Sequence, residues 1–335
     1  METVWTYVIW AGVVLAAWLC TVGIMFWKLT RREPYPLHHR EWLYRKIEKS
    51  PLAEWVPVLR RGADWLNDTP YDDAWVLGDD GQSMHARLFL HRDQLNEGRL
   101  MILCHGYHSD PEVDFGASAE EYYNAGMHLL VIDQRAHGDS EGERVCFGVK
   151  EGYDIRNWCW YVRREYPKME IVLCGVSMGA TAVLRAAAMP NLPRNVIGVI
   201  ADSAYTNPYR EFQYVLRRHG CFLPGIFLGP LRLVCRKWAK FDMRAFDTTQ
   251  EVPKITVPVL FVHGEADKLV PPSCTRANYD ACTSPKTLLM VPGAGHAVSW
   301  LADQPRYREV LHQFLQSLPD RRDLPRKSTT AAESK

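Results

Sequence analysis

The chain has 335 residues, 47% of them hydrophobic, which is enough to bury one large core within a single domain. Its 40 lysine and arginine residues nearly balance 39 aspartate and glutamate residues, leaving a formal net charge of +1. This balance gives no electrostatic reason to expect nucleic acid or a highly charged substrate as a partner. The nine cysteines are an odd number, and Cys104 and Cys174 end apolar runs, so we expect reduced core thiols and no disulfide framework.

The start of the chain predicts a membrane anchor. Residues 3–27 contain no charge, and a helix of this length can cross a hydrocarbon core of about 30 Å. A cleaved signal peptide is the competing interpretation, but it has a basic start and a shorter apolar core, whereas the only early charge here is Glu2. Lys28, Arg31 and Arg32 follow the apolar stretch, so the positive-inside rule places the rest of the chain in the cytoplasm.

The rest of the chain reads as a linker followed by alternating strands and helices. Residues 28–70 are basic and aromatic and predict a membrane-proximal linker that packs on the domain at 71–318. Two runs flanking the turn sequence DDGQS predict a hairpin. Six β-rich runs come next, with helical patterns between them: RLMILCHG, HLLVID, EIVLCGVS, VIGVIAD, VPVLFVHG and TLLMVPGAGH. This alternation predicts an α/β fold with a mostly parallel central sheet and helices on both faces.

Two segments depart from this alternation. Residues 205–250, which are rich in aromatic residues, arginine, glycine and proline, predict a helical insertion outside the sheet that can serve as a lid. Residues 319–335 are polar and poor in aliphatic side chains, so they predict a disordered tail.

The sequence CGVSMGA predicts a catalytic nucleophile. It places Ser177 between Gly175 and Gly179, after an apolar strand pattern and before a helix of small residues. This strand, sharp turn and helix are the context in which a Gly-x-Ser-x-Gly serine is exposed at the end of a sheet. The glycines suit a turn that leaves little room for Cβ atoms.

A serine hydroxyl also needs a base that is itself held by a carboxylate. His296 lies in a glycine-rich loop after the last β-rich run, and Asp267 follows the preceding run. The chain order Ser177, Asp267, His296 is one in which this triad is found. Asp202, which ends the strand before the insertion, is the alternative acid; Asp267 is favoured because its strand precedes the one that leads to His296.

Other reactive side chains receive simpler interpretations. His105, His137 and His263 are predicted to be turn and packing residues, because none follows an acid in the expected order. Cys104, His105 and His108 lack the spacing of a metal site and have no second ligand cluster, so no metal site is predicted.

Negative charge on the attacked carbonyl oxygen requires preorganised donors. The backbone N–H of Met178, directly after Ser177, and that of Tyr107, in the loop after RLMILCHG, are the predicted pair. Only backbone geometry matters for this role, so the side chains are free to vary.

Together these segments resemble the α/β-hydrolase superfamily over about residues 72–318. The likeness rests on LCHGYHSD, VIDQRAHGDSEG, CGVSMGA, VHGEADKLVP and GAGHAVSW in that order. Within the superfamily the chain is similar to membrane-anchored bacterial hydrolases of the Bem46-like and serine aminopeptidase-type group, a closer likeness carried by DQRAHGDSEG and CFGVKEGYDIRNW. One departure is Ala136, where relatives more often have glycine.

The resemblance implies an α/β-hydrolase fold with a triad of Ser177, Asp267 and His296. It also implies oxyanion donors at Tyr107 and Met178, and neither a metal nor an organic cofactor.

The expected activity is hydrolysis of an ester or thioester of an apolar acyl group, from a small-molecule or lipid-like substrate, through an acyl-enzyme on Ser177. The phenylalanine, leucine and valine residues of the insertion are expected to roof an apolar pocket. A serine aminopeptidase is the alternative; it needs an acidic group for the substrate amine, for which Glu265 and Glu211 are candidates. A non-catalytic, membrane-tethered binding module would be expected to carry a broken triad, whereas all three residues are present.

Overall fold

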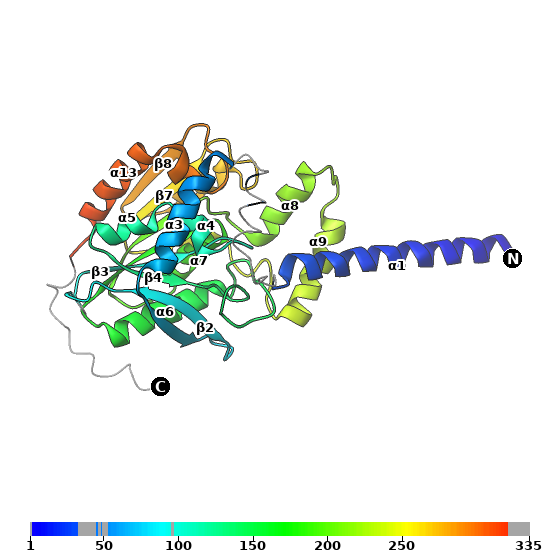
Figure 1. The fold of residues 1–335 in the computed structure, drawn as a ribbon. Helices are drawn as coiled ribbons and strands as arrows, with labels where there is room; N and C mark the ends of the chain where they lie inside the picture. Colours follow the sequence, from blue (N-terminus) through cyan, green and yellow to red (C-terminus); the bar gives the residue numbers. More distant parts are fainter. Residues whose placement is uncertain (1, 33–44, 46–47, 49–52, 95–96, 321–335) are drawn as a thin grey trace.

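A computed structural model describes residues 2–32, 45, 48, 53–94 and 97–320 (Figure 1). Residues 33–44, 46–47 and 49–52 of the predicted linker (28–70) lie outside these ranges. So do residues 321–335 of the predicted tail (319–335). The described part confirms the predicted architecture, a mostly parallel sheet with helices on both faces and a helical insertion.

The sheet has eight strands in the order β1-β2-β4-β3-β5-β6-β7-β8. The predicted hairpin and all six predicted strands are present: β1 (Asp72–Leu77), β2 (Ser83–Phe89), β3 (Arg99–Cys104), β4 (His128–Ile132), β5 (Glu170–Val176), β6 (Val196–Asp202), β7 (Val259–Gly264) and β8 (Lys286–Val291). Only the β1–β2 and β2–β4 pairs are antiparallel. The carboxyl ends of β3, β5, β6, β7 and β8 therefore share one edge of the sheet, where ligand sites of open α/β sheets form.

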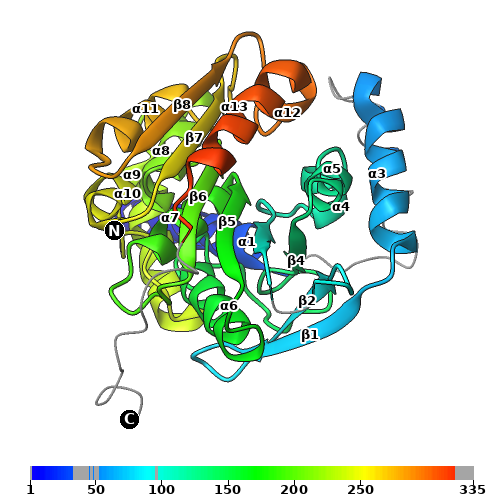
Figure 2. The same cartoon turned by 90° about the vertical axis from the view of Figure 1, so that its left-hand side faces the viewer.

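Helices cover the two faces of the sheet, as Figure 2 shows. Buried apolar side chains of α6 and α7 form the core on one face, and those of α3, α5 and α13 form it on the other. The helices after the N-terminal one are α3 (Val56–Asp68), α4 (Pro111–Phe115), α5 (Ala119–Asn124), α6 (Glu151–Glu165), α7 (Met178–Ala187), α8 (Pro208–Arg218), α9 (Gly225–Val234), α10 (Thr248–Glu251), α11 (Pro272–Ala281), α12 (Ser299–Ala302) and α13 (Gln304–Ser317). Short helical turns lie at Ala53–Trp55, Cys235–Ala239 and Val252–Lys254. The central strands are buried along their whole length, which explains why they read as continuous apolar runs.

Helix α3 lies within the segment that the sequence predicts only as a linker. Its apolar residues recur at helical spacing, with Leu59, Ala63 and Leu66 buried. It crosses α4 so closely that a Cβ atom on Gly62 would lie 1.5 Å from the Gly116 carbonyl oxygen. Glycine at position 62 therefore allows this contact, and α3 forms part of the hydrolase domain's core.

The N-terminal helix α1 (Glu2–Thr30) projects from the domain beside α9 (Figure 1). An 18-residue window of this helix has a mean hydropathy of 2.2, and the stretch from Thr3 to Thr30 is long and apolar enough to cross a membrane. It continues beyond the predicted span, and its last turns contact the domain: Val22, Phe26 and Thr30 are buried. Arg32 donates from its backbone N–H to Glu143 O at 2.9 Å, which ties the chain after the helix to the domain.

Candidate active site

Ser177 occupies the sharp turn between β5 and α7. Its φ of 55° and ψ of −114° are strained for a residue with a side chain. A Cβ atom on Gly175 would lie 2.4 Å from the Gly179 backbone, and one on Gly179 would lie 1.9 Å from Cys104 O. The two glycines thus permit the close approach that brings the serine to the carboxyl edge of the sheet.

The structure brings together the three residues predicted as a triad. Ser177 Oγ lies 2.8 Å from His296 Nε2, and His296 Nδ1 lies 2.7 Å from Asp267 Oδ2. The residues come from three different strand ends, after β5, β8 and β7 respectively. With the proton placed on Nδ1 to suit the carboxylate, Nε2 accepts from the serine hydroxyl, which is the arrangement a general base requires.

Asp267 is buried and fully hydrogen-bonded. Besides His296, it accepts from His263 Nε2 at 3.1 Å and from the backbone N–H groups of Leu269 and Val270 at 2.8 and 3.0 Å. Burial alone would raise the pKa of Asp267, but the hydrogen bonds from His263 and His296 hold it well below its usual range. The carboxylate is therefore ionised at neutral pH and can stabilise an imidazolium at His296.

Asp202, the alternative acid, is directed elsewhere. Its Oδ1 accepts from the hydroxyl groups of Ser203 at 2.9 Å and Ser299 at 3.1 Å. Burial raises its pKa. Asp202 thus fastens the loop that carries His296, while Asp267 makes the hydrogen bond to the imidazole.

Both residues predicted as oxyanion donors are close to Ser177 along the chain or in space. Met178 is the first residue of α7, so its N–H is one of those that a helix leaves without an internal partner. Gly106 is so close that a Cβ atom on it would lie 3.3 Å from Ser177 Cβ. Tyr107 follows directly, which places its backbone beside the serine.

Two side chains that sequence reasoning did not assign to the site hold this loop. Asp114 of α4 accepts from Gly106 N at 2.5 Å and from Ser109 Oγ at 2.8 Å. His137 Nε2 accepts from His108 N at 3.2 Å. The local sequence gives no signal for these roles, because they depend on contacts between loops that follow different strands.

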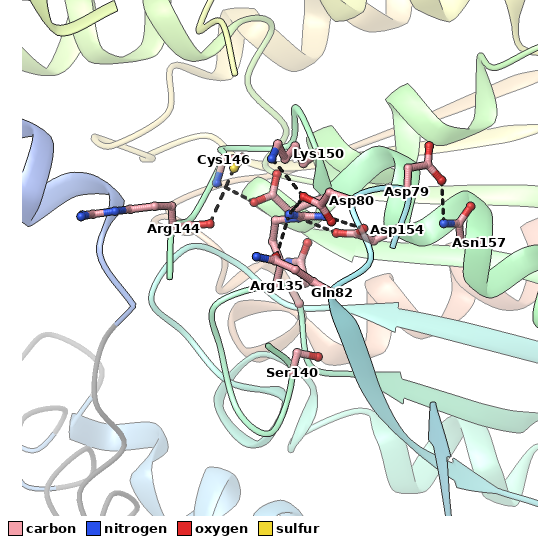
Figure 3. A network of polar contacts seen from close by, with 12 residues as sticks. Asp79, Asp80, Gln82, Arg135, Ser140, Arg144, Cys146, Lys150, Asp154 and Asn157 are labelled. Carbon is pink, nitrogen blue, oxygen red and sulfur yellow. Dashed lines mark hydrogen bonds and ion pairs between the residues drawn. The ribbon is translucent and has the colours of Figure 1, made fainter. Parts of the chain in front are cut away.

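An ion-pair network centred on Arg135 lies in the same loop as His137, and Figure 3 shows Arg135 with its partners Asp80 and Asp154. The buried Arg135 donates from Nε and Nη2 to both Asp154 oxygens at 2.7 Å and from Nη1 to Asp80 at 3.0 Å. Burial alone would lower the pKa of Arg135, but the hydrogen bonds and negative charges of these carboxylates outweigh burial and raise the pKa above its usual value. Arg135 therefore stays protonated. Arg135 O in turn accepts from His137 Nδ1 at 2.9 Å, which leaves Nε2 free of a proton and able to accept from the His108 N–H.

Ala136, in the same loop, has a backbone conformation that favours glycine. Its φ is 61°, in the left-handed region that glycine adopts without strain. Ala136 is fully buried and donates its N–H to Glu141 O at 3.0 Å. The turn therefore forms with alanine at a position where glycine would be free of strain.

One group of side chains has the composition of a metal site. Ligand atoms of His85, Asp133 and Asp139 lie within 4.8 Å of one another. They already bind each other or neighbouring groups, however: His85 contacts Asp133 at 2.8 Å and Asp73 at 2.9 Å, and Asp139 N donates to Asp133 at 3.0 Å. These hydrogen bonds explain why the three side chains lie together: they support the loop after β4.

The fold and the site define an α/β hydrolase. The chain matches the family model described as serine aminopeptidase, S33, over residues 96–224 and 233–300, and it belongs to this family. Among curated proteins it is similar to the uncharacterised protein YqkD of Bacillus subtilis, at 26% identity over 66% of this chain and 72% of that protein. Human monoglyceride lipase is 28% identical over 52% of this chain and 68% of the lipase.

Solved structures give the same fold. The Pyrococcus furiosus esterase Pf2001 superposes with a TM-score of 0.60, at 20% identity, over 76% of this chain and 95% of the esterase. The chain is therefore an α/β hydrolase by its family and its fold.

Proposed function

We propose that this protein is a serine hydrolase that cleaves an ester or thioester of an apolar acyl group through an acyl-enzyme on Ser177. The observation that carries the proposal is the continuous hydrogen-bond chain from Ser177 Oγ through His296 to the ionised Asp267, with bonds of 2.8 and 2.7 Å. A serine on a strained turn with this partner pair has the geometry of an activated nucleophile.

The mechanism follows from the positions of these atoms. His296 Nε2 takes the hydroxyl proton as Ser177 Oγ attacks the carbonyl carbon, and Asp267 stabilises the imidazolium. The Met178 and Tyr107 N–H groups donate hydrogen bonds to the carbonyl oxygen as it becomes negatively charged. Each donor stabilises the transition state by roughly 2.7 to 4 kcal/mol. His296 then protonates the leaving group, and a water activated by the same ring releases the acid.

The apolar character of the acyl group is supported by the lid, the insertion at residues 205–250. Its buried side chains pack in one cluster with Met178, next to the nucleophile, and with Phe147. The lid residues of that cluster are Tyr205, Tyr209, Leu228, Leu231, Cys235, Ala239, Phe241, Met243 and Phe246. A substrate that enters beside Ser177 therefore meets a largely hydrocarbon surface.

A serine aminopeptidase is the second candidate, favoured by the name of the family model. Of the two acids considered for its amine site, Glu265 is exposed and pairs with Arg276 at 3.3 Å. Glu211 lies on α8 with Oε1 buried and unpartnered within the described part of the chain. Burial, aided by the charge of Asp267, raises its pKa to about 8, so it offers little negative charge to an α-ammonium group at neutral pH. We therefore rank ester hydrolysis first.

Labelling with a fluorophosphonate probe tests the proposal. We expect the wild type to be labelled, and Ser177→Ala and His296→Ala to lose labelling. Ser273→Ala, at an exposed serine of α11, is the matched control and should label like the wild type. If the folded wild-type protein is not labelled, the serine hydrolase proposal is overturned, and a non-catalytic, membrane-tethered binding module is favoured.

Substrate profiling separates the two enzyme activities. We expect p-nitrophenyl esters to be cleaved with kcat/KM rising with acyl length, and aminoacyl anilides to be poor substrates. If the anilides are preferred and Glu211→Gln abolishes that preference, the protein is an aminopeptidase.

We also propose that α1 anchors the enzyme, with the catalytic domain on the cytoplasmic side. The apolar Thr3–Thr30 helix and the basic residues Lys28, Arg31 and Arg32 at its end support this orientation. Resistance to carbonate extraction, and protease protection of the domain in intact cells, would be the expected results; release by carbonate would contradict the anchor.

A further inference from the structure

The end of α1 is built into the domain beside the proposed active site. One face of α1 packs against the cluster of buried lid side chains described above. Its residues recur at three- and four-residue spacing: Trp18, Val22, Met25, Phe26 and Leu29. Val22 and Phe26 are only 2% and 9% exposed. This face contacts α9, whose Leu228 and Leu231 belong to the same cluster.

The same helix end also contacts the loop that carries the proposed oxyanion donor. Tyr107 Oη donates to Leu29 O at 2.9 Å, and His108 Nε2 lies 3.1 Å from Arg31 O. The site is therefore next to the point where α1 leaves the domain.

The length of α1 sets the level of the membrane. If the turns from Val22 onward are occupied by the domain, Thr3–Thr21 remains, which is about 28 Å of helix at 1.5 Å per residue. This matches a hydrocarbon core of about 30 Å. The bilayer surface then lies near Thr21. Figure 1 shows that α8 and α9 are the part of the domain that extends farthest along α1, and α9 contacts this helix.

The lid exposes large apolar side chains. We define the lid patch as its large exposed hydrophobic residues: Phe222, Leu223, Ile226, Leu233 and Trp238, which are 94%, 66%, 49%, 61% and 61% exposed. Exposed basic residues, Lys237 and Lys240, lie in the same segment. Apolar side chains with lysines next to them suit the boundary between acyl chains and phosphate headgroups.

We infer that the lid patch lies in the headgroup region of the bilayer beside α1, so that the site receives its acyl substrate from the membrane surface. The inference rests on the proposed anchor and hydrolase functions. Its occupant is lipid, because α9, which carries Ile226 and Leu233, contacts the apolar helix α1 and belongs to the part of the domain that extends farthest along it.

Cys221, partly exposed and next to Phe222, offers a natural reporter. The full chain with Cys20→Ala and Cys274→Ala is labelled at Cys221 with a nitrobenzoxadiazole maleimide and placed in phosphatidylcholine–phosphatidylglycerol nanodiscs containing doxyl-labelled lipid. A second protein carries the label at Cys20, with Cys221→Ala and Cys274→Ala. A third carries it at Arg164→Cys, on the exposed end of α6, with all three of these cysteines replaced.

We expect lipid quenching of the probes at positions 221 and 20 and none at position 164. Quenching at position 20 alone would overturn the lid contact and leave the anchor standing, whereas quenching at neither would overturn both. A probe at 221 that is shielded from lipid in a chain with the mass of a dimer would assign the patch to a second copy and also overturn the inference.

Activity gives an independent test. Leu223→Ser with Trp238→Ser should lower hydrolysis of a long-chain ester held in vesicles at least tenfold, while hydrolysis of a short soluble ester stays unchanged. The matched control is Leu77→Ser, which removes an equally exposed leucine on β1 and should change neither rate. Equal rates of the double variant and wild type on vesicles would overturn the inference; wild type inactive on both esters would instead overturn the proposed function.

Discussion

Replacing Asp267 by asparagine should remove catalysis with little change in shape. Asp267 Oδ1 accepts from the backbone N–H groups of Leu269 and Val270, so the amide oxygen must take this position. The amide NH2 then occupies the place of Oδ2, where His296 Nδ1 lies at 2.7 Å and His263 Nε2 at 3.1 Å. Both ring nitrogens, which donate to the carboxylate, would meet a donor.

The imidazole of His296 can relieve this conflict only by moving its proton to Nε2. That nitrogen lies 2.8 Å from Ser177 Oγ, so it would present a proton where a base is needed. An equivalent change of tautomer in a serine triad lowers kcat roughly 10⁴-fold. This corresponds to about 5 kcal/mol of transition-state stabilisation at 1.36 kcal/mol per factor of ten.

The assay is kcat for a p-nitrophenyl ester, with thermal unfolding to verify that the variant is folded. Asp202→Asn is the matched control. Its amide oxygen can still accept from Ser203 and Ser299, so we expect a loss of less than tenfold. A loss below tenfold in folded Asp267→Asn, or a 10⁴-fold loss in Asp202→Asn alone, would refute the assignment of Asp267 as the triad acid.

Three further outcomes follow from the geometry. Gly179→Ala should lower the thermal unfolding midpoint or prevent folding, because its Cβ would lie 1.9 Å from Cys104 O; a native-like midpoint would refute the close contact. Asp114→Ala should lower kcat about 10- to 100-fold with KM little changed, since it removes the acceptor for both Gly106 N and Ser109 Oγ in the loop that carries Tyr107; an unchanged kcat would show that this loop needs no such support. Burial lowers the pKa of His137 well below 6.5, so the unfolded chain binds a proton first as pH falls. The neutral His137 should therefore stabilise the folded chain above about pH 6.5, and this stabilisation should be lost as the pH falls below that value. His137→Gln should weaken this pH dependence of the free energy of unfolding, measured in urea.

The sequence predicts the sheet because its central strands are buried on both faces and therefore consist of unbroken apolar residues. The positions of Ser177, Asp267 and His296 also follow from local patterns, since each comes after a strand whose carboxyl end lies at the same edge of the sheet. The structure adds the strained turn and the short contacts between the three side chains.

Other features depend on contacts that no local pattern encodes. Asp114 holds the loop after β3 only because α4 folds back on it. His263, which is predicted as a packing residue, contacts Asp267 across a turn. The inner face of α1 could not be read from the sequence because the helix is apolar on every side, so its composition does not show which face meets protein and which meets lipid. Helix α3 lies in a segment whose basic and aromatic composition obscures its apolar spacing.

Trapping the covalent intermediate tests the central claim most directly. The full-length enzyme is mixed with a slowly hydrolysed long-chain acyl ester, quenched in acid within the first turnover, digested and analysed by mass spectrometry. We expect the acyl mass on the peptide that contains Ser177 and no such mass in Ser177→Ala. Turnover of the ester with no acyl adduct on Ser177, or with the adduct on another residue, would contradict the central claim.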